Sequence, residues 1–226
     1  MKVVSLFSGG KDSAFALWCA QMQGWDVTSL VTVIPESNES WMFHHPAIEW
    51  TKLQADAAGI PRTVIHTKGV KEEELIDLKE GLRQLVKSTG IEGIVSGAIA
   101  SEYQRTRLDN LCETLSIRSF APLWHKNQQQ LLREQVESGF EIVITACNAL
   151  GFTKAWLGRR LDATSVNELI QLNVKYGLSV AFEGGEAETF VLRAPMFRGH
   201  IKIERSVPHW KNDSGYVNFE KLRLIA

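Results

Sequence analysis

The sequence contains few cysteines, and their spacing excludes several kinds of site. Three occur in 226 residues, Cys19, Cys112 and Cys147, and they lie far apart without a C-x-x-C pair. An odd number of widely spaced thiols argues against a disulfide framework, a zinc site or a paired redox centre. We therefore expect three reduced cysteines.

The sequence also lacks an excess of charge of one sign and lacks long apolar runs. The 25 basic and 26 acidic residues give a formal net charge of −1, which argues against a protein that binds nucleic acid through bulk charge. No apolar run approaches membrane-spanning length, and the N-terminus leads into a strand without the layout of a signal peptide. These absences favour a cytoplasmic protein without a membrane partner, and they leave a homo-oligomer open.

The first half of the chain alternates between strand and helix patterns. Strands are predicted at 3–7, 27–34, 62–66, 93–97 and 117–121, and helices from Ala14, over 47–58, over 71–88 and from Ser101 to about 115, with a loop at 36–46. Such alternation predicts an α/β fold with a Rossmann-like, mainly parallel sheet. Ligands of these sheets bind at the carboxyl ends of the strands, here after Phe7 and after Ser96.

The most informative segment joins the first strand to the first helix and reads Ser8-Gly9-Gly10-Lys11-Asp12-Ser13. Glycines let a backbone approach an oxyanion, and the first N–H groups of a helix point at it. Lys11 adds a point charge, and Ser8 and Ser13 add hydroxyl donors. The spacing of a Walker A loop is absent. The segment is thus interpreted as a different phosphate-binding loop, in preference to a plain glycine turn.

The pattern changes near Trp124. The second half predicts helices at 128–138 and 164–176, strands at 141–146 and 189–193, and an antiparallel pair, 200–207 and 216–224, joined through 211–215. We expect residues 1–124 to form a nucleotide-binding domain. Residues 125–226 are expected to form a smaller α+β region that binds the substrate.

A second informative segment is an acidic loop in this second half. Glu183, Glu186 and Glu188 lie within six residues around Gly184 and Gly185. Such a flexible acidic loop is suited to holding Mg²⁺ or to orienting a cationic or amine nucleophile. A solvated turn before a strand explains the spacing equally well.

Two basic segments are less specific. Arg105 and Arg107 follow the fourth strand and its exit glycine, Gly97, and can reach phosphate or carboxylate, although a solvated helix face is the simpler interpretation. The segment 154–160 combines basic and aromatic residues and fits either an acidic partner or solvent. His44-His45 lies in the loop at 36–46 without other ligands at metal spacing.

Taken together, these segments resemble the diphthine–ammonia ligase (diphthamide synthetase) family, in its short archaeal form, within the N-type ATP pyrophosphatases. The matching pieces occur in the family's order and span nearly the whole chain: 8–13, 97–105, 122–124, 156–159 and 183–191. The first piece is shared by many ATP pyrophosphatases, whereas the later ones are more particular.

The resemblance implies a reaction and roles for individual residues. ATP, ammonia and the diphthine residue of elongation factor 2 would give diphthamide, AMP and pyrophosphate through an acyl adenylate. The β,γ-phosphates and their Mg²⁺ would be held by Ser8, Gly9, Gly10, Asp12 and Ser13. Asp12 would be the metal ligand, Lys11 would neutralise developing charge, and Gly97 and Arg105 would belong to the nucleotide site. The acceptor or ammonia would be oriented by Glu183, Glu186 and Glu188, and one of these three acids could accept its proton.

Three positions depart from the family's pattern. The family usually has Gly at the position of Phe182, an aromatic residue at that of Ala187 and an acid at that of Arg193. These departures leave the acceptor open. Position 2 is Lys rather than the nucleophilic Cys of a glutaminase, so free ammonia or another chain is expected to supply nitrogen.

Two other functions compete with this interpretation. A tRNA-modifying ATP pyrophosphatase shares the first loop, but thiolation commonly uses paired cysteines and tRNA binding favours a basic chain. A non-catalytic sensor of ATP or AMP would signal through a partner and would release neither AMP nor pyrophosphate.

Overall fold

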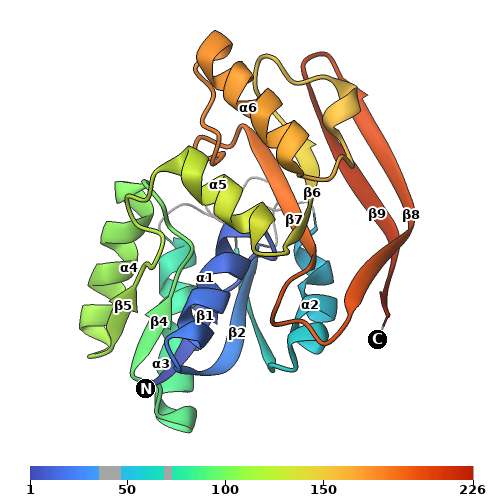
Figure 1. Ribbon diagram of the computed structural model, residues 1–226. Helices are drawn as coiled ribbons and strands as arrows, with labels where there is room; N and C mark the ends of the chain where they lie inside the picture. The colour runs from blue at the N-terminus through green and yellow to red at the C-terminus, as the bar shows by residue number, and fades with distance from the viewer. Residues whose placement is uncertain (36–46, 69–72, 226) are drawn as a thin grey trace.

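The computed structural model describes residues 1–35, 47–68 and 73–225. The chain forms two β-sheets, and the first half builds one while the second half builds the other (Figure 1). The loop expected at 36–46, with His44-His45, and the start of the helix expected at 71–88 lie outside the described residues.

The first sheet is parallel, as the strand–helix alternation predicts. Its order is β3–β2–β1–β4–β5, with bounds β1 Lys2–Leu6, β2 Asp26–Pro35, β3 Arg62–Thr67, β4 Gly93–Val95 and β5 Arg118–Phe120. Its helices are α1 Lys11–Met22, α2 Thr51–Ala58, α3 Glu73–Thr89 and α4 Glu102–Thr114, and the 3₁₀ turn η1 Ile48–Trp50 precedes α2. Strand order reverses between β1 and β4, and such a switch point opens a crevice for ligands.

The second sheet is antiparallel and has the order β7–β6–β9–β8. Its strands are β6 Glu141–Cys147, β7 Ala187–Arg193, β8 His200–Lys211 and β9 Ser214–Ile225, and its helices are α5 Gln128–Glu137, α6 Ala163–Tyr176 and the 3₁₀ turn η2 Lys154–Trp156. The predicted hairpin of β8 and β9 is confirmed with longer strands. Asn212 in its turn has a φ of 53°, a left-handed conformation that asparagine tolerates.

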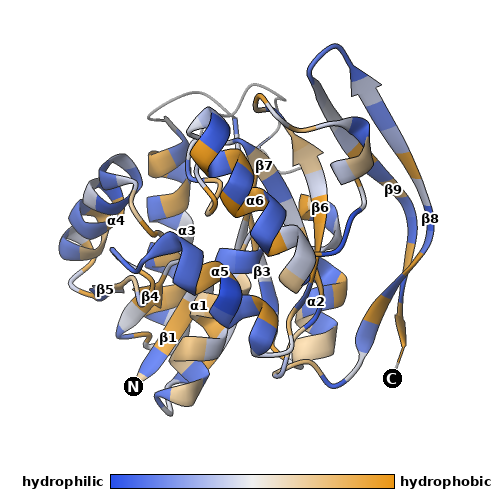
Figure 2. Ribbon diagram, turned by 45° about the horizontal axis from the view of Figure 1, so that its top comes forward, coloured by the Kyte–Doolittle hydropathy of each residue, from blue (hydrophilic) through white to orange (hydrophobic). Residues whose placement is uncertain are grey.

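The largest cluster of buried hydrophobic residues contains side chains from both halves of the chain. Side chains alternate along a strand, so Val3 and Val4 of β1 face opposite sides of the first sheet, and both are fully buried. Val3 belongs to the same cluster as Leu17 of α1 and Ile142 of β6. Figure 2 shows hydrophobic residues along β1 and β6, whereas α4 and the β8–β9 hairpin carry many hydrophilic ones. Helix α1 is therefore packed between the two sheets.

Several element boundaries differ from the sequence-based expectation. Helix α1 begins at Lys11 rather than Ala14, so Lys11, Asp12 and Ser13 form its first turn and not a loop. Strand β7 begins at Ala187 rather than Thr189, which places Glu188 in a strand. The expected helix over 47–58 starts as a 3₁₀ turn. Such ends depend on tertiary partners, which local patterns do not encode.

The cysteines are free thiols, as expected. Burial raises the pKa of Cys112 and of Cys147 to about 12, and it also raises the pKa of Cys19. Thiols with such pKa values are poor nucleophiles at neutral pH. No helix in residues 1–35, 47–68 or 73–225 is long and apolar enough to span a lipid bilayer.

Candidate functional site

The segment 8–13 combines the short connection after β1 with the first turn of α1. Gly9 has a φ of 83°, a left-handed conformation that favours glycine, and a Cβ there would overlap Oε1 of Gln54. The hydroxyl oxygens of Ser8 and Ser13 lie 3.2 Å apart, and the Ser13 hydroxyl also donates to the Gly10 carbonyl at 3.1 Å. The two predicted hydroxyls thus lie next to the N-terminus of a helix, where anions bind.

Gly97 lets the loop after β4 approach this turn. A Cβ at Gly97 would lie 2.7 Å from both the carbonyl carbon of Asp12 and the backbone nitrogen of Ser13. Because a real Cβ cannot approach backbone that closely, glycine is the residue that fits here. The two loops that the sequence places at carboxyl ends of strands, after Phe7 and after Ser96, therefore contact each other in the structure.

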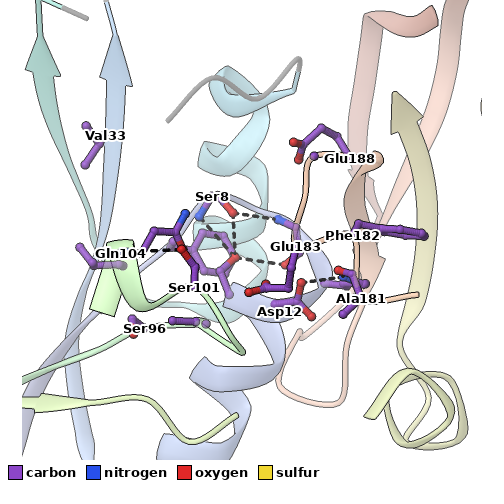
Figure 3. Close-up of a pocket in the computed structure, with 18 of the residues that line it drawn as sticks. Ser8, Asp12, Val33, Ser96, Ser101, Gln104, Ala181, Phe182, Glu183 and Glu188 are labelled. Atoms are coloured by element: carbon purple, nitrogen blue, oxygen red, sulfur yellow. Dashed lines mark hydrogen bonds and ion pairs between the residues drawn. The ribbon is translucent and has the colours of Figure 1, made fainter. Parts of the chain in front are cut away.

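A cavity of about 520 Å³ opens between these loops and the start of β7. That volume falls within the usual range for small-molecule sites. The predicted site residues that line it are Ser8, Gly10, Lys11, Asp12, Ser13, Gly97, Arg105, Glu183 and Glu188. Figure 3 shows Ser8, Ser101, Asp12 and Glu183 gathered in the middle of this pocket.

Lys11 points toward the second half of the chain. Its ammonium donates to Oδ2 of Asp12 and to the carbonyl of Ala181, both at 2.6 Å, and lies 4.9 Å above the ring centroid of Phe182. The Lys11 side chain is only 3% exposed. Gln135 of α5 donates to the other Asp12 oxygen at 2.9 Å. Both carboxylate oxygens of Asp12, the expected metal ligand, thus have protein partners.

The three acids of the acidic loop have different surroundings. Glu183 accepts from the backbone N–H of Ala100 at 2.9 Å and so connects the loop to the segment after β4. Glu186 accepts from the backbone N–H groups of Ser179 and Gly184, at 2.9 and 2.8 Å, which holds the turn in shape. Glu186 does not line the cavity, whereas Glu188 does. Glu186 thus differs from Glu183 and Glu188, because it lies outside the cavity lining.

Burial raises the pKa of Glu183, and the negative charge of Asp12 raises it further. The Ala100 N–H and the Lys11 ammonium act in the opposite direction. A carboxyl group with a raised pKa is a better general base near neutral pH than an ordinary one. Glu183 therefore combines a position in the cavity with a proton affinity suited to a general base.

The raised pKa of Glu183 predicts a pH-dependent change in stability. The folded state favours the protonated acid, so its stabilising contribution is complete below the ordinary pKa of about 4.3 and is lost as pH rises through the higher folded pKa. Glu183→Gln mimics the protonated form. Thermal unfolding of the wild type and this variant, from about pH 4.5 to 8, should show the variant more stable at neutral pH. The difference should shrink toward acid pH, and a pH-independent difference would contradict the assignment.

The basic segments mainly make internal contacts. The Arg105 guanidinium lies 4.4 Å above the Trp124 ring and 3.4 Å from Asp109, and Arg105 borders the cavity. Arg159 pairs with both oxygens of Glu168 at 2.6 Å and lies over Trp156. Within 154–160, this pairing fits the simpler interpretation and not a docking patch for an acidic partner.

Strand β7 contacts the segment 8–13 directly, which the sequence did not predict. The N–H of Val191 donates to the Gly9 carbonyl at 3.0 Å, and the N–H of Lys11 donates to the Thr189 hydroxyl at 3.1 Å. The buried Gln54 amide donates to the carbonyls of Gly9 and Val191, at 2.9 and 2.8 Å. No local sequence pattern identifies Gln54, Thr189 or Gln135 as contacts of this segment, because a single polar residue in an apolar pattern does not reveal its partner.

Two family models match the chain in succession. The model described as diphthamide synthase N-terminal domain matches residues 1–119, and the one described as diphthamide synthase C-terminal domain matches residues 127–225. Together they span nearly all of the sequence.

Curated relatives match over similar lengths. Diphthine–ammonia ligase of Rattus norvegicus is 35% identical over 99% of this chain and 91% of that protein. The Homo sapiens protein of the same name is 36% identical over 91% of this chain and 84% of that protein. The Schizosaccharomyces pombe protein is 34% identical over 100% of this chain and 40% of that protein. A solved structure described as a predicted subunit of tRNA methyltransferase, from Methanocaldococcus jannaschii, is 18% identical with a TM-score of 0.48, over 86% of this chain and 98% of that one.

Proposed function

Because this chain belongs to the diphthamide synthase family, we propose that it is a ligase that amidates diphthine with ammonia, converts ATP to AMP and pyrophosphate, and yields diphthamide. The match of both family models along nearly the whole chain carries the proposal. The cavity at the β1–β4 switch point supports it, because nucleotides bind at such positions.

The chemistry explains why ATP is needed. A carboxylate is a poor electrophile, since its leaving group would be oxide. Transfer of AMP to the diphthine carboxylate turns that oxygen into part of a good leaving group, and ammonia then attacks the acyl adenylate. The residues proposed to hold the departing β,γ-phosphates are Ser8, Gly9, Gly10 and Ser13, because they form the cradle at the start of α1.

Mg²⁺ is proposed to accompany the nucleotide and to screen charge on its phosphates. The described residues contain no cluster of three His, Cys, Asp or Glu that could hold a metal by itself. Pocket carboxylates nevertheless fit Mg²⁺, which usually takes one or two carboxylates and fills its other positions with phosphate oxygens and water. Asp12 and Glu188 are the proposed ligands because both line the cavity.

On the acceptor side, Glu183 is proposed to orient ammonia and to accept the proton that the attacking nitrogen loses. Its place in the cavity, where it connects the acidic loop to the segment after β4, supports this role. Glu186 is proposed to act indirectly by fixing the turn from which Glu183 projects. Arg105 and Gly97 are proposed to shape the nucleotide side of the cavity.

The proposed protein substrate is elongation factor 2 bearing diphthine, and the proposed location is the cytoplasm. The formal net charge of −1 supports the proposal that the protein does not bind nucleic acid through its overall charge. A tRNA-modifying thiolase is less well supported, because Cys112 and Cys147 are buried with raised pKa values. A homo-oligomer is compatible with all of these proposals.

The test is a reaction with purified components. Diphthine-bearing elongation factor 2 is incubated with the protein, ATP, Mg²⁺ and ammonium, and the factor is examined by mass spectrometry. We expect conversion of the carboxylate to the amide, with equal amounts of AMP and pyrophosphate. Formation of ADP and phosphate would refute α–β cleavage, and the absence of any nucleotide product would favour the non-catalytic sensor.

A further inference from the structure

Phe182 adopts a backbone conformation that normally belongs to glycine. Its φ is 65°, in the left-handed region, where a side chain crowds the backbone. Such strain persists only where surrounding contacts hold it, and it concentrates at functional sites. Phe182 directly precedes the acidic loop and lines the cavity, so its contacts bear on the reaction.

The Phe182 ring covers a buried ammonium. The ring is packed against Phe152, at 6.2 Å between centroids, and the Lys11 nitrogen lies 4.9 Å above it. A cation over an aromatic face is stabilised by the ring's negative face, more strongly when water is excluded. Here the Lys11 side chain is 3% exposed, so the ring also keeps water away.

Lys11 belongs to the turn at the start of α1, but its ammonium holds the other half of the chain. Two of its three contacts, the Ala181 carbonyl and the Phe182 ring, come from the two residues immediately before the acidic loop. The third is Asp12. Two of the three ammonium N–H donors are thus engaged and the Phe182 ring covers the nitrogen, so the ammonium is directed at these groups.

The contacts continue from Phe182 to the carboxylate of Glu183. The Phe182 carbonyl accepts from the N–H of Gly185 at 3.1 Å, which closes a tight turn around Glu183. From this turn Glu183 reaches the Ala100 N–H at 2.9 Å. In Figure 3, Asp12, Ala181 and Glu183 lie close together, with Phe182 directed away from Ser8. The position of Glu183 therefore depends on how residues 181–182 are anchored.

We propose that Lys11 and Phe182 form a clamp that fixes the acidic loop against the first turn of α1. Lys11 is thereby a positioning residue that acts through Glu183, and not a phosphate ligand. The left-handed backbone of Phe182 turns the chain so that its ring covers the ammonium while the next residue enters the cavity. This inference rests on the proposed function for its reaction but makes a separate statement about the loop.

The first test is Lys11→Met, which keeps most of the side-chain volume and removes the charge. We expect the kcat for amide formation to fall about a hundredfold while the Kd for ATP changes less than about threefold. Lys126→Met is the matched control, since it removes a lysine paired with a surface glutamate, Glu134, and should keep wild-type kinetics. A loss of ATP affinity in step with kcat would overturn the proposal and make Lys11 a phosphate ligand.

A series at Phe182 tests the other half of the clamp. Phe182→Tyr retains an aromatic face and should keep activity within about threefold, whereas Phe182→Leu should lose about tenfold or more in kcat without a matching change in ATP affinity. Phe140→Leu removes a buried ring packed against Phe15 and Trp18, outside this cavity, and controls for general destabilisation. Equal kinetics of Phe182→Leu and Phe182→Tyr would refute a role for the ring.

Hydrogen exchange separates failure of the clamp from failure of the proposed function. In Lys11→Met, peptides covering 179–190 should exchange faster than in the wild type, while peptides covering 8–16 should not. This result is expected whether or not the wild type amidates diphthine. Unchanged exchange at 179–190 would refute the clamp, whereas a wild type that forms no amide would refute only the proposed function.

Discussion

Gly97→Ala is expected to weaken ATP binding and to lower kcat/KM by about a hundredfold or more, the scale for a displacement of about 1 Å in an active site. The added methyl would lie 2.7 Å from backbone atoms of Asp12 and Ser13. Neither can yield like a flexible side chain, so the first turn of α1 and the loop after β4 must separate. Calorimetric titration with ATP and Mg²⁺, alongside steady-state kinetics, measures the effect.

Gly93→Ala is the matched control for this prediction. Gly93 lies at the opposite end of β4, and a Cβ there would meet the ring of Phe120 at 2.7 Å and the Arg118 carbonyl at 2.9 Å. Both substitutions create contacts too close for a real Cβ, but only Gly97 borders the cavity. We expect Gly93→Ala to lower the melting temperature while the folded protein still binds ATP normally. If Gly97→Ala also kept normal ATP affinity, the cavity would not be the nucleotide site.

Glu183→Gln is expected to slow amide formation by about a hundredfold while the Kd for ATP stays within about threefold, the signature of an interaction made in the transition state. The amide has nearly the shape of the acid and can still accept from the Ala100 N–H, so the loop should keep its position. What it loses is the capacity to take a proton from the attacking nitrogen. Single-turnover kinetics with diphthine-bearing elongation factor 2 would isolate this step.

Two further variants test whether the effect on amide formation is specific to Glu183. Glu186→Gln weakens one of two anchoring contacts outside the cavity, so we expect a smaller loss of kcat and a lower melting temperature. Glu113→Gln, exposed in the last turn of α4, should behave as wild type. If ATP binding collapsed together with activity in Glu183→Gln, the acidic loop would belong to the metal–nucleotide site, and its assignment to the acceptor would be wrong.

The sequence alone determined the elements whose signals are local. Apolar runs separated by helical segments gave the parallel sheet, and the glycines and serines of residues 8–13 identified the cradle at the start of α1. Gly97 could be located because a glycine directly after a buried strand permits a tight exit. These features depend on neighbours within a few positions, so a single sequence contains them.

The tertiary structure alone decided what those residues do to one another. Lys11 contacts Ala181, 170 positions away, and Asp12 receives a hydrogen bond from Gln135, 123 positions away. The division between Glu183 in the cavity and Glu186 outside it arises in the same way, as does the hydrogen bond from the N–H of Lys11, the first residue of α1, to Thr189. A residue type restricts which interactions are available, but a buried charge is stabilised only by the particular groups that the fold brings to it. The direction of the Lys11 ammonium follows from that packing and not from the motif.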